Sequence, residues 1–327
     1  MDDDDRVARA RRHIDVTRGR GLEVGPLYSP MVTRVEADVR YVDIHLAPEL
    51  RAHYATHPGI PVDDIVEVDF AMIHEGEERS LAEAVATAAP FDWIIASHVI
   101  EHVPDVVTWL ADVAEVLADG GLVVLAIPDR RFCFDALRPP TTVGEMLRAH
   151  LARDTRPSAR AVFDHFSSAV DATAAELWRG DVPTRAAVIH GNAYAWEQVQ
   201  AAANTRAYVD CHVWLFTPGT FVDQLRTLGE LGLLDLTLAD LTPTAVGELE
   251  FFVSLRRVPR GLDPDAHRGA VLSGFPDEAG AAALDTRPVV PPSALALSAW
   301  ERRGVMLKRA VLGSVRSLLA RVRTRRA

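Results

Sequence analysis

The sequence predicts an α/β fold, a doubly wound sheet of seven strands with a helical cap inserted after the fifth strand. Three observations lead to this prediction. Short apolar runs rich in Val and Ile alternate with helical patterns in the first half of the chain, as in sheets that are buried on both faces. The alternation stops at residue 130 and resumes at residue 216. No apolar run reaches the length of about 18 residues that a membrane-spanning helix requires.

The first five strands are the apolar runs themselves. Each is bounded by Gly, Pro or acidic residues, and their continuous apolar character is typical of strands covered on both sides. Between the fourth and fifth runs, residues 103–118 have apolar side chains at helical spacing, and Pro104 suits the first turn of a helix. The expected strands are 21–25, 39–43, 65–69, 91–96 and 122–127.

The second half of the pattern completes the sheet. Residues 217–231 are expected to form a helix, and residues 233–240 a sixth strand. Residues 248–257 alternate between apolar and polar side chains, which predicts the seventh strand. The loops that follow the carboxyl ends of strands are where open α/β sheets bind ligands. We therefore expect the inserted residues to cover a substrate.

The chain is accordingly divided into three parts. Residues 1–129 and 216–258 form the predicted core, and residues 130–215 form the predicted helical cap. Residues 259–327 are expected to be a linker, rich in Pro, Gly and Ala, followed by a basic amphipathic helix at 300–325.

Charge and cysteine content limit the classes of function. The net charge is −11, although the last 28 residues carry nine Lys and Arg and one acid. The acidic body disfavours extended nucleic-acid binding. The basic end is suited to peripheral contact with an inner membrane surface, to a partner or dimer helix, or to solvent. Two cysteines and an acidic N-terminus, unlike a signal peptide, favour a cytoplasmic protein without a disulfide framework or a cysteine zinc site.

The first strands carry the signs of a nucleoside-containing cofactor. Strand 21–25 includes Glu23 and runs into a turn at Gly25, where a ligand can approach the backbone closely. Asp43 ends the second strand, and a carboxylate there can accept hydrogen bonds from both ribose hydroxyls. A nicotinamide dinucleotide would need two further glycines, and Pro26 removes an amide donor. The alternative is that Asp43 and Asp69 only terminate strands.

A histidine cluster follows the fourth strand. If residues 98–102 form a helical turn, His98, Glu101 and His102 share one face and form half of a divalent-metal site. His212 is the best candidate for a fourth ligand. Imidazoles favour a transition metal such as Mn, Fe, Co or Zn over Mg. Without a metal, His98 or His102 is expected to act as a general base. The alternative is a purely structural role, in which these side chains pack against the next helix and cap it.

The order of these motifs resembles the class I S-adenosylmethionine-dependent methyltransferases. They are Glu-x-Gly at 23–25, Asp43, Asp69, and the stretches 91–104 and 117–128. The resemblance implies that Glu23, Gly25 and Pro26 lie by the methionine part of the cofactor and Asp43 by the ribose. It further assigns Asp69 and Phe70 to the adenine, and Ser97 to the wall near the sulfonium.

The reaction site resembles smaller groups within that family. The small-RNA 2′-O-methyltransferases and the ubiquinone-pathway O-methyltransferases carry a Glu-x-x-Glu-His metal motif, in which His98 here replaces the first Glu. The stretches 134–142 and 210–218 are similar to those of bacterial methyltransferases of glycan assembly. This resemblance implies methylation of a sugar hydroxyl. A quinone, a natural product or an RNA 2′-hydroxyl is the alternative acceptor.

Overall fold

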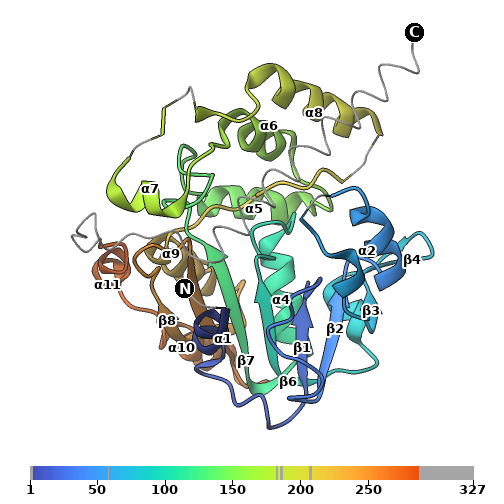
Figure 1. Ribbon diagram of the computed structural model, residues 1–327. Helices are drawn as coiled ribbons and strands as arrows, with labels where there is room; N and C mark the ends of the chain where they lie inside the picture. Colours follow the sequence, from blue (N-terminus) through green and yellow to red (C-terminus); the bar gives the residue numbers. More distant parts are fainter. Residues whose placement is uncertain (1–2, 58, 182, 185–186, 206–207, 287–327) are drawn as a thin grey trace.

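The computed structural model describes residues 3–57, 59–181, 183–184, 187–205 and 208–286. Its central sheet has seven strands in the order β3-β2-β1-β6-β7-β9-β8 (Figure 1). The first five of these are parallel, whereas β9 runs antiparallel to both of its neighbours. The strands are β1 Gly21–Val24, β2 Val39–Asp43, β3 Phe70–Ala71, β6 Phe91–Ser97, β7 Leu117–Pro128, β8 Leu236–Thr242 and β9 Glu250–Arg257. The predicted doubly wound sheet is confirmed.

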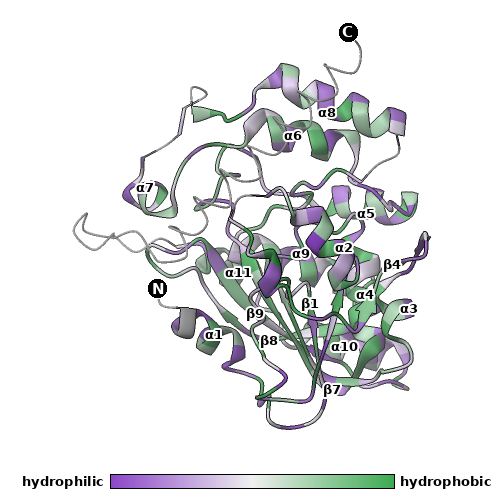
Figure 2. Cartoon of the chain, turned by 45° about the vertical axis from the view of Figure 1, so that its right-hand side comes forward, coloured by the Kyte–Doolittle hydropathy of each residue, from purple (hydrophilic) through white to green (hydrophobic). Residues whose placement is uncertain are grey.

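Alternating side chains of the central strands build two apolar layers. In β6, Ile94 and Ala96 belong to the larger core, while Trp93 and Ile95 belong to the core on the opposite face. Because both faces are covered, the strands have the continuous apolar sequences from which they were predicted. Figure 2 shows these strands as mostly hydrophobic.

Helices cover the two faces and the carboxyl edge of the sheet. Helix α4 begins three residues later than predicted, because the Asp105 side chain caps it by accepting hydrogen bonds from the Val107 and Thr108 amides at 3.1 Å. Helix α9 agrees with its prediction to within one residue at each end. These core helices are α1 Asp3–Arg11, α2 Ala47–Tyr54, α3 Leu81–Val85, α4 Val106–Val116 and α9 Pro218–Glu230.

Two short elements complete the early half. A 3-10 turn, η1, spans Val62–Asp64, and strands β4 (Ile73–His74) and β5 (Glu77–Glu78) form a separate hairpin. The third strand of the sheet was predicted at 65–69, but only Phe70–Ala71 pairs with β2. The Asp69 side chain accepts the Tyr41 amide hydrogen at 2.7 Å and thereby ends the ladder at this edge.

Four helices lie between β7 and α9 in the chain, within the predicted cap. They are α5 Val143–Ala152, α6 Ala159–Ser168, α7 Ala174–Arg179 and α8 Asn192–Thr205. Figure 1 shows α6 and α8 together beyond α5, at the carboxyl end of the parallel strands. They pack through Phe166, Ala195 and Val199, whereas Phe132 stacks on Trp178 in a separate small core.

The expected linker is partly wrong. Residues within 259–286 form helices α10 Pro264–Leu272 and α11 Glu278–Ala283, which pack on α9. Asp285 fixes the start of α9 by accepting hydrogen bonds from the Thr217 hydroxyl and the Gly219 amide. The predicted basic helix at 300–325 lies outside the described residues. Among the described helices, none combines the length and apolar character needed to span a membrane.

Candidate functional site

The loop after β1 is held in a shape that only glycine adopts easily. Gly25 has a φ of +67°, and a Cβ there would lie 3.1 Å from Val99 Cγ2. The buried Glu23 carboxylate accepts the amide hydrogens of Met31 at 2.7 Å and Val32 at 3.0 Å. Burial raises the pKa of Glu23 to about 7, against the opposing effect of these amides. Glu23 and the buried Pro26 therefore shape this loop, and their contact with the cofactor stays a prediction.

Asp43 is the carboxylate best placed for a ligand at this edge. One of its oxygens accepts the Ile44 amide hydrogen at 2.7 Å, and within the described part of the chain its other oxygen accepts none. Burial raises the pKa of Asp43 to about 6. Asp69, predicted to contact the adenine, is paired with Arg34 at 2.7 Å and accepts the Tyr41 amide hydrogen, and its contact with the cofactor stays a prediction. Phe70 follows it on β3 and is partly buried.

An ion-pair network that sequence reasoning missed lies at the carboxyl edge of the sheet and spans β7, from the end of β6 to the start of β9. The Arg6 guanidinium donates to the Glu250 carboxylate at 2.5 and 2.9 Å and to the Ser97 hydroxyl at 2.7 Å. His98 Nε2 lies 2.7 Å from the same carboxylate. Helix α1 is thereby tied to the carboxyl edge of the sheet. The Ser97 hydroxyl, predicted near the sulfonium, contacts Arg6 in this structure.

His98 contacts Glu101 but does not join the group of ligand atoms that the other three predicted ligands form. The prediction assumed a helical turn, but His98 has a φ of +54° and precedes the turn at residues 100–102. Its ring lies between two carboxylates, with Nδ1 at 3.3 Å from Glu101 and Nε2 at 2.7 Å from Glu250. Burial alone would lower the pKa of His98, but these carboxylates raise it to about 9. His98 is therefore the partner of two carboxylates in this structure, and its roles as a metal ligand and as a general base stay predictions.

The other three predicted ligands do come together. Ligand atoms of Glu101, His102 and His212 all lie within 4.8 Å of one another. Glu101 is 1% exposed; its Oε1 lies 3.3 Å from His98 Nδ1, and its Oε2 accepts no hydrogen bond within the described residues. The Val213 amide donates to the Glu101 carbonyl at 2.7 Å, which holds the extended cap segment bearing His212 against the turn bearing Glu101.

The two imidazoles of this group are each held by a carboxylate. His102 Nδ1 lies 2.7 Å from Asp210 Oδ1, and His212 Nδ1 lies 2.6 Å from Asp135 Oδ2. Burial lowers the pKa of His102, but Asp210 and Glu101 raise it to about 9. These carboxylates therefore favour the protonated form of His102, and its role as a general base stays a prediction. Sequence reasoning did not identify Asp210, two residues before His212.

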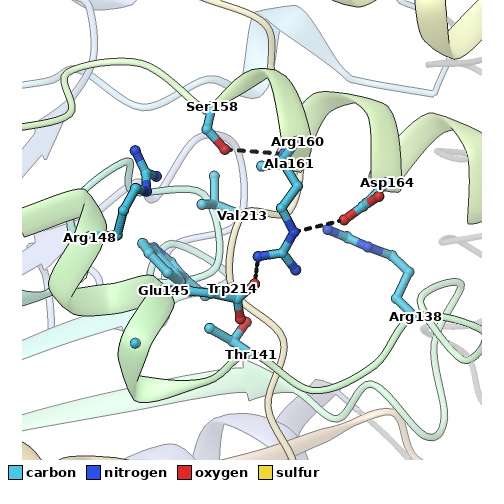
Figure 3. Close-up of a pocket in the computed structure, with 11 residues that line it drawn as sticks. Arg138, Thr141, Glu145, Arg148, Ser158, Arg160, Ala161, Asp164, Val213 and Trp214 are labelled. Atoms are coloured by element: carbon cyan, nitrogen blue, oxygen red, sulfur yellow. Dashed lines mark hydrogen bonds and ion pairs between the residues drawn. The ribbon is translucent and has the colours of Figure 1, made fainter. Parts of the chain in front are cut away.

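A polar cavity of about 270 Å³ lies beside this group, between α5, α6 and residues 213–214 (Figure 3). Its arginines already have acidic partners: Arg160 pairs with Glu145 and Asp164, and Arg138 pairs with Asp135 at 2.8 Å. Trp214 lines the cavity and donates its indole hydrogen to the Val103 carbonyl. This cavity is therefore lined by ion pairs and hydroxyl groups around one aromatic ring.

The comparison with protein families decides the class of protein. The family described as "Methyltransferase domain" matches residues 5–206 of this chain. The chain belongs to this methyltransferase family. The sheet is accordingly the class I methyltransferase sheet, and the methyltransferase uses S-adenosylmethionine as its methyl donor. No curated protein matches the sequence.

Several solved structures resemble this methyltransferase at low sequence identity. The N-methyltransferase NodS from Bradyrhizobium japonicum WM9 is 12% identical, with 79% of this chain and 97% of that chain covered and a TM-score of 0.36. The mitomycin 7-O-methyltransferase MmcR is also 12% identical, with coverage of 77% and 53% and the same TM-score. An S-adenosylmethionine-dependent methyltransferase from Mesorhizobium loti is 15% identical, with coverage of 76% and 95% and a TM-score of 0.36. Nothing about the acceptor follows from these similarities.

Proposed function

We propose that this methyltransferase transfers its methyl group to an oxygen atom, with a divalent cation held by Glu101, His102 and His212. One observation carries the proposal. Glu101 is a buried carboxylate whose Oε1 lies 3.3 Å from His98 Nδ1, whereas its Oε2 accepts no hydrogen bond within the described residues and the imidazoles of His102 and His212 lie close to it. A buried carboxylate oxygen without a donor is costly unless it binds a metal. The residues present therefore fit a cation.

The donor set also indicates which cation fits. Two imidazole nitrogens and one carboxylate favour Mn, Fe, Co or Zn, whereas Mg prefers oxygen ligands alone. A divalent cation held by Glu101, His102 and His212 would lower the pKa of an acceptor hydroxyl group and orient its oxygen. The protein positions the other reactant, since Asp43 can accept hydrogen bonds from the ribose hydroxyls of the methyl donor. The methyl group then passes from the sulfonium sulfur to the oxygen, and the hydroxyl proton leaves to solvent.

We further propose a sugar hydroxyl of a glycan as the acceptor. The stretches 134–142 and 210–218, which resemble those of glycan-associated methyltransferases, both contribute to the site through Asp135, Asp210 and His212. The cavity lined by ion pairs and by Trp214 suits a polar ring better than an apolar one. A net charge of −11 argues against an extended nucleic acid.

Metal analysis followed by an acceptor assay tests this function. The purified protein is expected to contain about one equivalent of a transition metal, and removal by a chelator should abolish methyl transfer that the metal restores. Acceptors with vicinal sugar hydroxyls, catechols and RNA 3′ ends are then compared with labelled S-adenosylmethionine. Full activity of the metal-free protein would refute the cation, and transfer to catechol or RNA alone would refute the sugar acceptor.

A further inference from the structure

Both histidines of the metal group use the same ring atom to contact a second carboxylate, and His102 Nε2 lies 3.9 Å from Glu101. Each bonds a carboxylate through Nδ1, at 2.7 Å for His102 with Asp210 and at 2.6 Å for His212 with Asp135. A neutral imidazole that donates its Nδ1 hydrogen to a carboxylate carries its lone pair on Nε2. Such partners fix the tautomer and orientation of a metal-binding ring and increase its basicity.

Asp135 is anchored on both sides. Its Oδ1 accepts from the Arg138 guanidinium at 2.8 Å, which leaves Oδ2 for His212. Asp135 and Arg138 are 1% and 3% exposed. Because Asp135 is held firmly, it gives the His212 ring a single orientation. Arg138 and His212 contact different oxygens of Asp135, so the hydrogen bond with His212 does not compete with the ion pair with Arg138.

Asp210 differs because it is reached from solvent. Its side chain is 74% exposed, and it lies between Tyr208 and His212 in an irregular segment of the cap. The Tyr208 hydroxyl donates to the His102 carbonyl at 2.9 Å, and the Val213 amide donates to the Glu101 carbonyl. The segment that carries Asp210 is thus fixed on both sides of Asp210 to the turn that carries Glu101 and His102.

From these Nδ1 contacts we propose that Asp135 and Asp210 are positioning residues for a transition-metal cation, acting through His212 and His102. This inference rests on the proposed metal group of Glu101, His102 and His212. Asp135 is the stronger of the two because it is buried and anchored, whereas solvent competes for the hydrogen bond of Asp210. Neither carboxylate touches the cation or the reacting atoms.

Titration with Co²⁺ tests the proposal on the full-length protein stripped of metal. Asp135→Asn and Asp210→Asn should each weaken Co²⁺ binding about 10- to 100-fold, with the larger loss for Asp135→Asn. At saturating Co²⁺ both variants should also shift the visible absorption bands of the ion, because the basicity of its imidazole ligands changes. Asp210→Glu, which keeps a carboxylate, should recover part of the affinity.

Two further variants separate the possible failures. Asp154→Asn removes a carboxylate that pairs with Arg148 at 2.7 Å and contacts no imidazole of the group, so its Co²⁺ affinity should equal that of the wild type. Glu101→Gln should abolish Co²⁺ binding. If Glu101→Gln abolishes binding while Asp210→Asn changes neither affinity nor spectrum, the positioning role is refuted and the metal site stands. Failure of the wild type to bind Co²⁺ would refute both. Asp135→Asn removes the ionic partner of the buried Arg138 and could unfold the protein. Asp210→Asn leaves that ion pair intact, so the test can be decided with Asp210→Asn alone.

Discussion

Replacement of Glu250 by Gln should destabilise the protein strongly, although the two side chains have nearly the same shape. The Glu250 carboxylate is 4% exposed and lies between the Arg6 guanidinium and the His98 ring. Burial alone would raise its pKa, but Arg6 and His98 lower the pKa to about 2 from an ordinary value of 4.5. This difference corresponds to about 3 kcal/mol of folding free energy at neutral pH.

The sign of the effect sets its pH dependence. Because the pKa of Glu250 is lower in the folded than in the unfolded protein, its contribution is fully present above about pH 4.5. It is lost as the pH falls toward about 2. Glu250→Gln should therefore lower the free energy of unfolding by about 2–4 kcal/mol at pH 7 and by much less at pH 3. Urea denaturation followed by tryptophan fluorescence measures both values.

Glu36 provides a matched control. Its pKa is likewise lowered to about 2, first of all by its hydrogen bond with Arg11, but its side chain is 44% exposed. Solvent screens such a pair, so Glu36→Gln should cost less than about 1 kcal/mol. A loss below 1 kcal/mol for Glu250→Gln, or equal losses for the two variants, would show that burial does not decide the strength of this network.

Three other substitutions test the site itself. Asp43→Ala should weaken S-adenosylmethionine binding by about 1.5–3 kcal/mol in calorimetry, whereas Asp38→Ala, on the surface, should not; equal affinities would exclude the ribose role. His102→Ala should abolish turnover and leave cofactor affinity unchanged, and retained turnover would contradict a reactive role for the cluster. Gly25→Ala and Gly120→Ala should each cost about 1–2 kcal/mol of stability because both positions have positive φ, but only Gly25→Ala should also weaken cofactor binding.

The sheet could be predicted because its strands are covered on both faces. Trp93 and Ile95 point to one apolar layer and Ile94 and Ala96 to the other. Residues 93–96 are therefore all apolar, which is the sequence pattern of a strand buried on both faces. The third strand was misplaced because residues 65–69 have an apolar character but run beside β2 without forming its ladder. The helices at 264–283 were missed because their Ala-, Gly- and Pro-containing sequences bury little apolar surface of their own.

The site was predicted where one turn supplies the residues and missed where distant segments meet. Glu101 and His102 are neighbours, so their proximity follows from the chain itself. Arg6 and Glu250 lie 244 positions apart, and Asp135 lies 77 positions from His212. Spacing along one element cannot report such contacts. The error at His98 has a local cause, since its left-handed backbone breaks the helical spacing from which the shared face was inferred.

The position of His98 explains how the site departs from the Glu-x-x-Glu-His motif that it resembles. A glutamate there would add a third negative charge beside Glu101 and Glu250, whereas the His98 ring lies between these two carboxylates, which raise its pKa to about 9. We propose that the substitution replaces a ligand by a counter-ion that also belongs to the network of Arg6 and Ser97. The proposed metal group is left with three protein ligands, the number that catalytic zinc sites use when one position remains for substrate or water. The loss of one ligand is thus consistent with a reactive site and argues against a purely structural one.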